Sequence, residues 1–106
     1  MKPLSKGEIT AQAALIKGWR IESGSLVRSL TFADFQEAWQ FMSHVAECAE
    51  AQDHHPNWYN AYNLVEIRLY THTVDGLTER DFKLAESINQ YLFQFGYQKQ
   101  VDLEKS

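Results

Sequence analysis

Histidines are the residues of this 106-residue chain whose type and spacing best suit proton transfer. His54 and His55 are adjacent and stand directly before Pro56, and His72 follows a run of alternating apolar and polar residues. An imidazole titrates near neutral pH, with a reference pKa of about 6.5, and therefore serves as either a general acid or a general base. These three histidines are the candidate catalytic residues.

Pro56 determines how the first two histidines can be presented. A proline disfavours the helical conformation at the residue before it, so the chain must turn at His55 as it leaves a helical pattern. We expect His54 and His55 to stand on an exposed corner that forms one wall of a pocket, and His72 to join them if its strand ends beside that corner. Alternatively, His54 or His55 has no catalytic role and only contacts carbonyl groups or solvent at the helix end. His44, inside the helical pattern, has no assigned role.

A metal site is the competing interpretation, because imidazole and carboxylate groups bind zinc and iron. Its ligands would be Asp53, His54, His55 and His72. Adjacent histidines chelate one ion poorly, and the chain has no His-Glu-x-x-His motif. We therefore predict no metal. The sequence also lacks a Gly-x-Ser-x-Gly elbow and a Gly-rich phosphate loop, and its one cysteine, Cys48, is expected to be a partly buried structural thiol.

The composition indicates a globular chain. Apolar residues make up 44% and charged residues 23%, which is ordinary for one domain, and we assign residues 1–106 to a single domain. The formal net charge of −4, with scattered Lys and Arg, disfavours direct binding to nucleic acid. No segment approaches the roughly 20 apolar residues of a membrane span, and the N-terminus lacks the apolar stretch of a secretory signal. A cytoplasmic protein is expected.

Three helices must position these residues. Each is announced by Ser or Thr followed three residues later by an acid, the capping-box pattern; the pairs are Ser5 with Glu8, Thr31 with Asp34, and Thr78 with Asp81. The first helix is predicted over residues 6–17, up to Gly18 as its C-cap. The second follows Thr31 and ends before Pro56, and the third follows Thr78 and ends at Gly96. Apolar residues recur at helical spacing in the second and third helices, so each is expected to bury one face.

Extended segments lie between the helices. Residues 19–22 and 26–30 flank Ser23-Gly24-Ser25 and are typical of a hairpin, and residues 58–62 and 65–71 form a second strand pair. In the last segment apolar and polar residues alternate, which places His72 with the polar face. The order of elements predicts an α+β fold: a four-stranded, mainly antiparallel sheet with three helices packed on one face.

A spaced motif connects these residues to a known family. It begins as Glu-x3-His-His-Pro at Glu50 and continues to Tyr62, His72 and Asp81. This pattern resembles the signature of the pterin-4a-carbinolamine dehydratases, also called 4a-hydroxytetrahydrobiopterin dehydratases. The resemblance extends more loosely over residues 31–94. It implies a hydro-lyase that removes water from 4a-hydroxytetrahydrobiopterin to give quinonoid dihydrobiopterin, and so recycles the pterin used by an aromatic amino acid hydroxylase.

The resemblance also implies roles for individual residues. His54 and His72 are expected to act as acid and base in an order that the sequence does not fix, while His55 orients the pterin. The pterin-binding residues would be His54, His55, Pro56, Thr71, His72 and Thr73. Glu50 and Asp81 would support them, although a helix cap alone explains Asp81. No cofactor is expected, since the pterin is the substrate.

Members of the family imply a second role as well, as a dimerisation cofactor for a homeodomain transcription factor. Tyr91 and Phe93, off the main stripe of the third helix, would suit a protein interface. A homodimer or homotetramer is expected, without direct contact to nucleic acid or membrane.

Overall fold

A computed structural model describes residues 2–97 of the chain, so Met1 and residues 98–106 of the predicted domain lie outside the described part. Its elements, in chain order, are α1 Lys6–Ala13, β1 Arg20–Glu22, β2 Ser25–Thr31, α2 Phe35–Gln52, β3 Asn57–Ala61, β4 Leu64–Leu69, the short 3-10 turn η1 His72–Val74, and α3 Glu79–Phe95. Among these helices none is long and apolar enough to cross a membrane.

The four strands form one sheet in the order β1-β2-β4-β3, and every neighbouring pair is antiparallel. The α+β fold with a four-stranded antiparallel sheet is therefore confirmed, and the predicted strand limits differ by one or two residues. Ser23 and Gly24 join β1 to β2, and both have positive φ, as a two-residue type I′ turn requires. Along β4 the buried residues Val65, Ile67 and Leu69 alternate with half-buried polar ones, so one face of the sheet is apolar.

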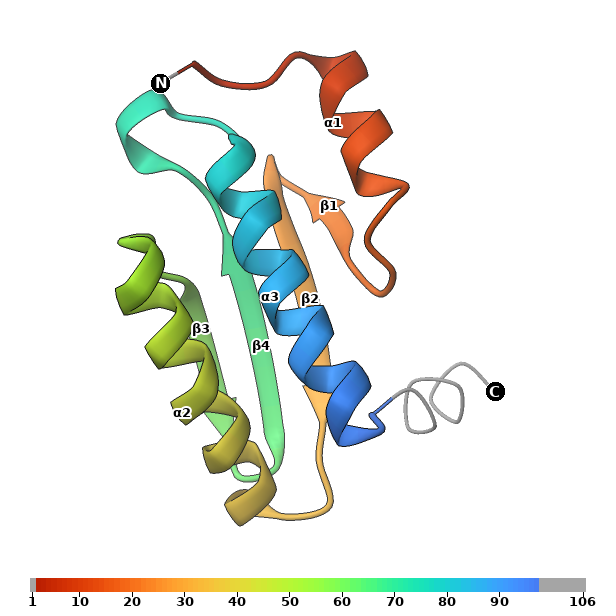
Figure 1. The fold of residues 1–106 in the computed structure, drawn as a ribbon, viewed down its shortest axis with the longest axis vertical. Coiled ribbons are helices and arrows are strands. Elements are labelled where there is room, and N and C mark those ends of the chain that lie inside the picture. The colour runs from red at the N-terminus through yellow and green to blue at the C-terminus, as the bar shows by residue number, and fades with distance from the viewer. Residues whose placement is uncertain (1, 98–106) are drawn as a thin grey trace.

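Helices α2 and α3 lie side by side across that apolar face (Figure 1). Each presents one buried stripe, because apolar residues recur every three or four positions. On α2 the stripe is Ala38, Phe41, Val45 and Ala49; on α3 it includes Phe82, Ala85, Ile88 and Leu92. These residues and the inward side chains of β2 and β4 make one contiguous core.

The first helix is shorter than predicted. α1 ends at Ala13 rather than near Lys17, and none of its residues is fully buried, although Ile9 and Ala13 pack partly against the core. After it the chain turns so that Ile16 becomes buried. Gly18 then adopts a φ of +89°, and a Cβ there would lie 2.5 Å from Cζ of Arg28. Gly18 is thus favoured by its left-handed backbone beside the Arg28 guanidinium, and it is not the C-cap of α1, which is Ala14.

The predicted start of the second helix was also wrong. Thr31 is the last residue of β2, and the N-cap of α2 is Asp34, whose side chain accepts a hydrogen bond from the backbone N–H of Glu37. The Glu37 carboxylate accepts in turn from the backbone N–H of Ala33. Both predicted boxes at the other helices, Ser5 with Glu8 and Thr78 with Asp81, are present.

Candidate active site

The candidate site begins where α2 ends. Asp53 occupies the left-handed region with φ 51° and ψ 45° as the C-cap of α2, and the backbone N–H of His54 donates to the carbonyl of Ala49. The chain then leaves the helix at Pro56 and enters β3, as the restriction on residues before a proline predicts. After this sharp turn the His54 side chain reaches Asp81 of α3, whereas the His55 side chain turns back to Glu50 of α2.

The other side of the site is the loop from β4 to α3. Thr71 and Gly76 exchange two backbone hydrogen bonds, of 3.0 and 3.3 Å, which close this loop into a tight turn. His72 opens the η1 turn inside it. Because β3 and β4 pair antiparallel with Asn57 opposite Arg68, the residues just before β3 lie beside those just after β4. The strand pairing therefore brings His54 and His55 close to Thr71 and His72.

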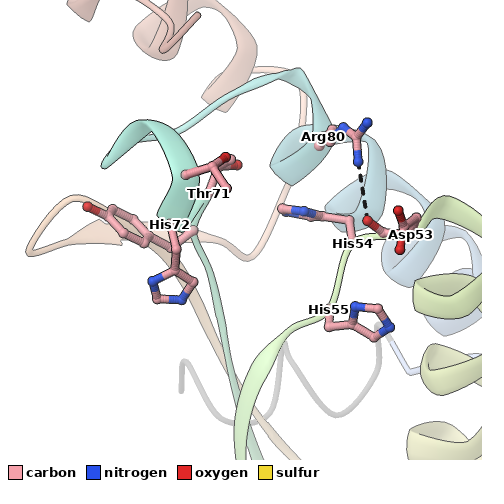
Figure 2. A pocket seen from close by; sticks show the side chains of 8 residues that line it. Asp53, His54, His55, Thr71, His72 and Arg80 are labelled. Atoms are coloured by element: carbon pink, nitrogen blue, oxygen red, sulfur yellow. Dashed lines mark hydrogen bonds between the residues drawn. The ribbon is translucent and has the colours of Figure 1, made fainter. Parts of the chain in front are cut away.

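These two segments and the first turn of α3 surround one surface cavity of about 380 Å³. Its lining residues are Asp53, His54, His55, Tyr70, Thr71, His72, Thr73 and Arg80. Figure 2 shows His54 and Thr71 facing each other across it, with His72 beside Thr71 and His55 beside His54. The volume falls within the range of about 300–1,000 Å³ typical of small-molecule sites.

His54 belongs to a buried hydrogen-bond network. Its Nε2 lies 2.6 Å from Oδ1 of Asp81, which is fully buried. The other oxygen of Asp81, Oδ2, accepts from the hydroxyl of Thr71 at 2.7 Å and from the backbone N–H of Thr78 at 2.9 Å. Since a carboxylate only accepts hydrogen bonds, this arrangement assigns a proton to Nε2 of His54. Asp81 thus caps α3 and orients His54 with the same carboxylate.

The other two histidines are more exposed. Nε2 of His55 lies 2.6 Å from Oε2 of Glu50, one turn back along α2, and both side chains are largely in solvent. Nε2 of His72 lies 3.3 Å from Nδ2 of Asn57, the first residue of β3. An amide nitrogen only donates, so His72 accepts at Nε2 in this arrangement.

The structure corrects one expectation and leaves others outside the site. His54 does not stand on an exposed corner: it is 8% exposed, because Asp81 draws its ring under the first turn of α3. Tyr62 of the motif lies in the β3–β4 turn with positive φ, at the end of β3 away from the cavity, and is 65% exposed. Pro56 is half-buried but does not line the cavity.

Three residues of the cavity wall, Asp53, Tyr70 and Arg80, were not among the predicted pterin-site residues, and Asp53 was considered only as a metal ligand. The alternation along residues 64–70 places Tyr70 on the polar side that was also predicted for His72, so the sequence carried a signal for it. Arg80 donates from Nη1 to the carbonyl of Asp53 at 3.2 Å, as the dashed line in Figure 2 shows. No local pattern predicts that bond, because it depends on how α2 and α3 pack.

His44 and Cys48 lie elsewhere, on α2. The His44 ring stacks on Tyr91 with ring centroids 4.4 Å apart, and its Nε2 is 3.5 Å from Sγ of Cys48. Burial raises the pKa of the Cys48 thiol, and the charge of Glu47 raises it further, so the reactive thiolate is disfavoured. Across residues 2–97, no group of three or more His, Cys, Asp or Glu side chains is placed to hold a metal ion.

Comparisons with known proteins agree on one family. The family model described as "Pterin 4 alpha carbinolamine dehydratase" matches residues 2–91. A protein of Nitrobacter hamburgensis named "Putative pterin-4-alpha-carbinolamine dehydratase" is 45% identical over 95 residues, which cover 88% of this chain and 94% of the relative. A protein of Christiangramia forsetii with the same name is 47% identical over 88 residues, covering 83% and 91% of the two chains.

A solved structure has the same fold. The crystal structure of a "transcriptional coactivator/pterin dehydratase" from Brucella melitensis superposes with a TM-score of 0.81 and 38% sequence identity. The match covers 84% of this chain and 97% of that one.

Proposed function

The chain belongs to the pterin-4α-carbinolamine dehydratase family, and we propose on that premise that it dehydrates 4a-hydroxytetrahydrobiopterin. In this reaction the bond from C4a to the hydroxyl breaks, N5 loses its proton, and a C4a–N5 double bond forms. The products are quinonoid dihydrobiopterin and water. The reaction requires a base at N5 and an acid at the leaving hydroxyl, without a change of oxidation state.

The observation that carries the proposal is the buried His54–Asp81 pair at the wall of a cavity that His55 and His72 also line. A positioned imidazole typically contributes about 10²–10⁴ in rate to a proton transfer. Three imidazoles around one cavity supply the acid and the base, and the cavity has room for a bicyclic pterin.

We assign the base to His54. Its Nε2–H is directed to Asp81, so Nδ1 is the nitrogen that remains for the substrate. When Nδ1 takes the proton from N5, the imidazolium that forms lies 2.6 Å from a buried carboxylate. Opposite charges at this distance stabilise each other strongly where water is excluded. The pair therefore stabilises the charge that appears during proton abstraction.

His72 is then the acid at the leaving hydroxyl, and His55 orients the pterin. His72 is exposed and can exchange protons with solvent between turnovers. His55 is held by Glu50, and its exposed contact is worth less than a buried one. Thr73, which lines the cavity beside His72, offers its hydroxyl group to the polar edge of the pterin, whereas the Thr71 hydroxyl donates to Asp81 and helps to hold that carboxylate.

We propose further that the reaction needs neither a metal ion nor a second cofactor. The donors and acceptors described above are sufficient for water elimination from a carbinolamine. An aromatic amino acid hydroxylase, whose cofactor is tetrahydrobiopterin, would supply the 4a-hydroxy substrate, and a separate two-electron reduction would convert the quinonoid product back into that cofactor.

The test is a stopped-flow absorbance assay of 4a-hydroxypterin breakdown with wild-type protein, His54→Ala and His72→Ala, each with and without a chelator. We expect each substitution to lower kcat by about 10² or more. His44→Ala is the matched control, since His44 lies outside the cavity and is expected to retain wild-type turnover. A wild-type rate equal to the spontaneous rate would refute the dehydratase, and loss of activity on chelation would refute the metal-free reaction.

A protein-binding role is the second candidate, supported by exposed aromatic residues. Phe35 and Trp39 on α2 stack on each other and are 45% and 56% exposed, and Phe93 on α3 is 68% exposed. Exposed aromatic groups are common at protein interfaces. The solved protein from Brucella melitensis is described as a transcriptional coactivator as well as a pterin dehydratase. We infer a homodimer or homotetramer as the basis of either role; sedimentation of wild-type protein and of Trp39→Ala would test whether this surface holds the copies together.

A further inference from the structure

The Tyr70 ring packs against the His72 ring at the wall of the cavity. The two ring centroids are 5.1 Å apart with an interplanar angle of 77°, an edge-to-face arrangement. Edge-to-face contacts between aromatic rings are favourable beyond the area they bury. Tyr70 is half-buried and also lines the cavity. One side of the His72 imidazole is therefore defined by the Tyr70 ring.

Asp75 holds both residues of this contact. Its side chain Oδ1 accepts a hydrogen bond from the Tyr70 hydroxyl, across the β4–α3 loop. Its backbone N–H donates to the carbonyl of His72 at 3.2 Å. Asp75 makes this second bond as the C-cap of η1, in the left-handed region with φ 53° and ψ 51°. One residue thus fixes the backbone of His72 and the ring that packs against its side chain.

We propose that Tyr70 and Asp75 form a clamp that holds the His72 imidazole in its productive orientation. Tyr70 and Asp75 are positioning residues in this proposal, because they act through His72 and not on the reacting atoms. The inference rests on the proposed dehydratase function for its effect on rate, but the clamp itself is a structural claim. The bond to Asp75 also raises the pKa of Tyr70, which keeps its hydroxyl protonated as a donor.

The clamp explains why an exposed loop can carry a catalytic group. His72 lies in a three-residue turn, and its only side-chain hydrogen bond among residues 2–97 is the 3.3 Å contact with Asn57. Long hydrogen bonds of exposed groups orient a ring weakly. A second restraint is needed to keep the ring from turning into solvent, and the Tyr70 ring supplies it. A displacement of about 1 Å in a reacting group can lower the rate by as much as 10²-fold.

The experiment separates the ring, the hydroxyl and the carboxylate. Tyr70→Phe keeps the ring and removes the donor, while Asp75→Gly removes the acceptor and accepts the positive φ without strain. We expect each to lower kcat about fivefold to tenfold with KM changed less than about twofold. The double variant should be no slower than either single variant, since both changes break one bond. Asp75→Asn retains an acceptor oxygen and should lose less than Asp75→Gly.

Two further variants show whether the effect passes through His72. In a His72→Ala background, Tyr70→Phe should have no additional effect on the residual rate. Tyr59→Phe, at a tyrosine of β3 that is 60% exposed and outside the cavity, is the matched control and should retain full activity. Equal losses from Tyr70→Phe in the presence and absence of His72 would overturn the proposal, as would independent, multiplicative effects of Tyr70→Phe and Asp75→Gly.

A readout without turnover keeps the clamp separate from the dehydratase function. The ring C–H protons of His72 should carry a ring-current shift from Tyr70 in NMR spectra, which Tyr70→Leu abolishes and Asp75→Gly reduces. Unchanged His72 resonances in both variants would overturn the clamp even in an active enzyme. Altered resonances in a protein that does not accelerate 4a-hydroxypterin breakdown would uphold the clamp and refute the proposed function.

Discussion

Asp81 shows how one side chain serves structure and chemistry together. A capping box explains an acid at this position, and the box is present in the structure. The box uses only Oδ2, however, and the same carboxylate reaches His54 through Oδ1. The N-terminal turn of α3 therefore places a buried carboxylate beside His54, the candidate base. The sequence signal for the cap was sufficient to locate Asp81, but its contact with His54 depends on the packing of α3 against the end of α2.

We predict that Asp81→Asn separates these two contributions. The amide keeps an acceptor for the N–H of Thr78 but removes the charge beside His54. Activity should fall by about 10²-fold or more, because the base loses the group that orients and stabilises its protonated form. The free energy of unfolding should fall by about 1–3 kcal/mol, as for other buried hydrogen bonds to charged groups. Steady-state kinetics and urea unfolding measure the two effects.

Glu79→Gln is the control for this change. It removes one negative charge from the same first turn of α3, where Glu79 is exposed and outside the cavity. Activity within twofold of wild type is expected. If Glu79→Gln were as harmful as Asp81→Asn, the net charge of the helix end would matter and the contact with His54 would not.

At the scale of elements, the type of every α-helix and strand was predictable, whereas the 3-10 turn η1, the end of α1 and the start of α2 were not. The alternation in β4 and the apolar stripes of α2 and α3 are set by side-chain burial, which a sequence displays directly. Thr31 and Asp34 both fit a capping pattern, and the choice between them was decided by β2, whose pairing with β4 extends to Thr31. Likewise α1 ends early because Ile16 must turn into the core.

The sequence predicted only in part that the segment with His54 and His55 lies beside the segment with Thr71 and His72. β3 and β4 form a hairpin with a short turn at Tyr62 and Asn63. Continuing their register past Asn57 and Arg68 brings His54 opposite the residues that follow β4. If residues 57–69 are predicted to form a hairpin, this register also predicts that His54 lies close to Thr71. The burial of His54 was not predictable in this way, because it requires Asp81 from α3.

The corrected start of α2 gives a prediction about stability. Asp34→Ala removes the side chain that accepts from the N–H of Glu37 and should cost about 1 kcal/mol. Thr31→Val removes the hydroxyl of the residue that the sequence pattern favoured, and keeps its β-branched shape in the strand. It should change the free energy of unfolding by less than about 0.5 kcal/mol. Urea unfolding of both variants decides between the caps, and a larger loss from Thr31→Val would restore Thr31 as the cap.

At the scale of the whole molecule, the candidate site lies at one end of the α2–α3 pair. A second polar cluster, centred on Asn89, joins α3 to the segment after α1 and to the sheet. Nδ2 of Asn89 on α3 donates to the carbonyl of Lys17 at 3.0 Å, and Oδ1 of Asn89 accepts from Trp19 Nε1 and from Arg28 Nη1, each at 2.7 Å. Asn89 therefore joins α3 to the segment after α1 and to β2. This network is partly buried, and such networks favour one arrangement of elements because an unmade bond is costly where water is scarce.

Asn89 consequently offers a test of whether the fold and the site can be separated. Asn89→Ala removes three hydrogen bonds, and we expect it to lower the free energy of unfolding by about 1–3 kcal/mol, since Trp19 and Arg28 lose a partner. Asn89 lies about 12 Å along α3 from Asp81, at 1.5 Å per residue, so the carboxylate beside His54 should keep its place. We therefore expect kcat to stay within about twofold of wild type at a temperature where the variant is folded. Gln90→Ala, an exposed neighbour, is the control and should change stability by less than about 0.5 kcal/mol. A large loss of kcat in folded Asn89→Ala protein would show that the contacts of Asn89 with the segment after α1 and with β2 set the geometry of the site, and that α3 transmits the change from Asn89 to Asp81.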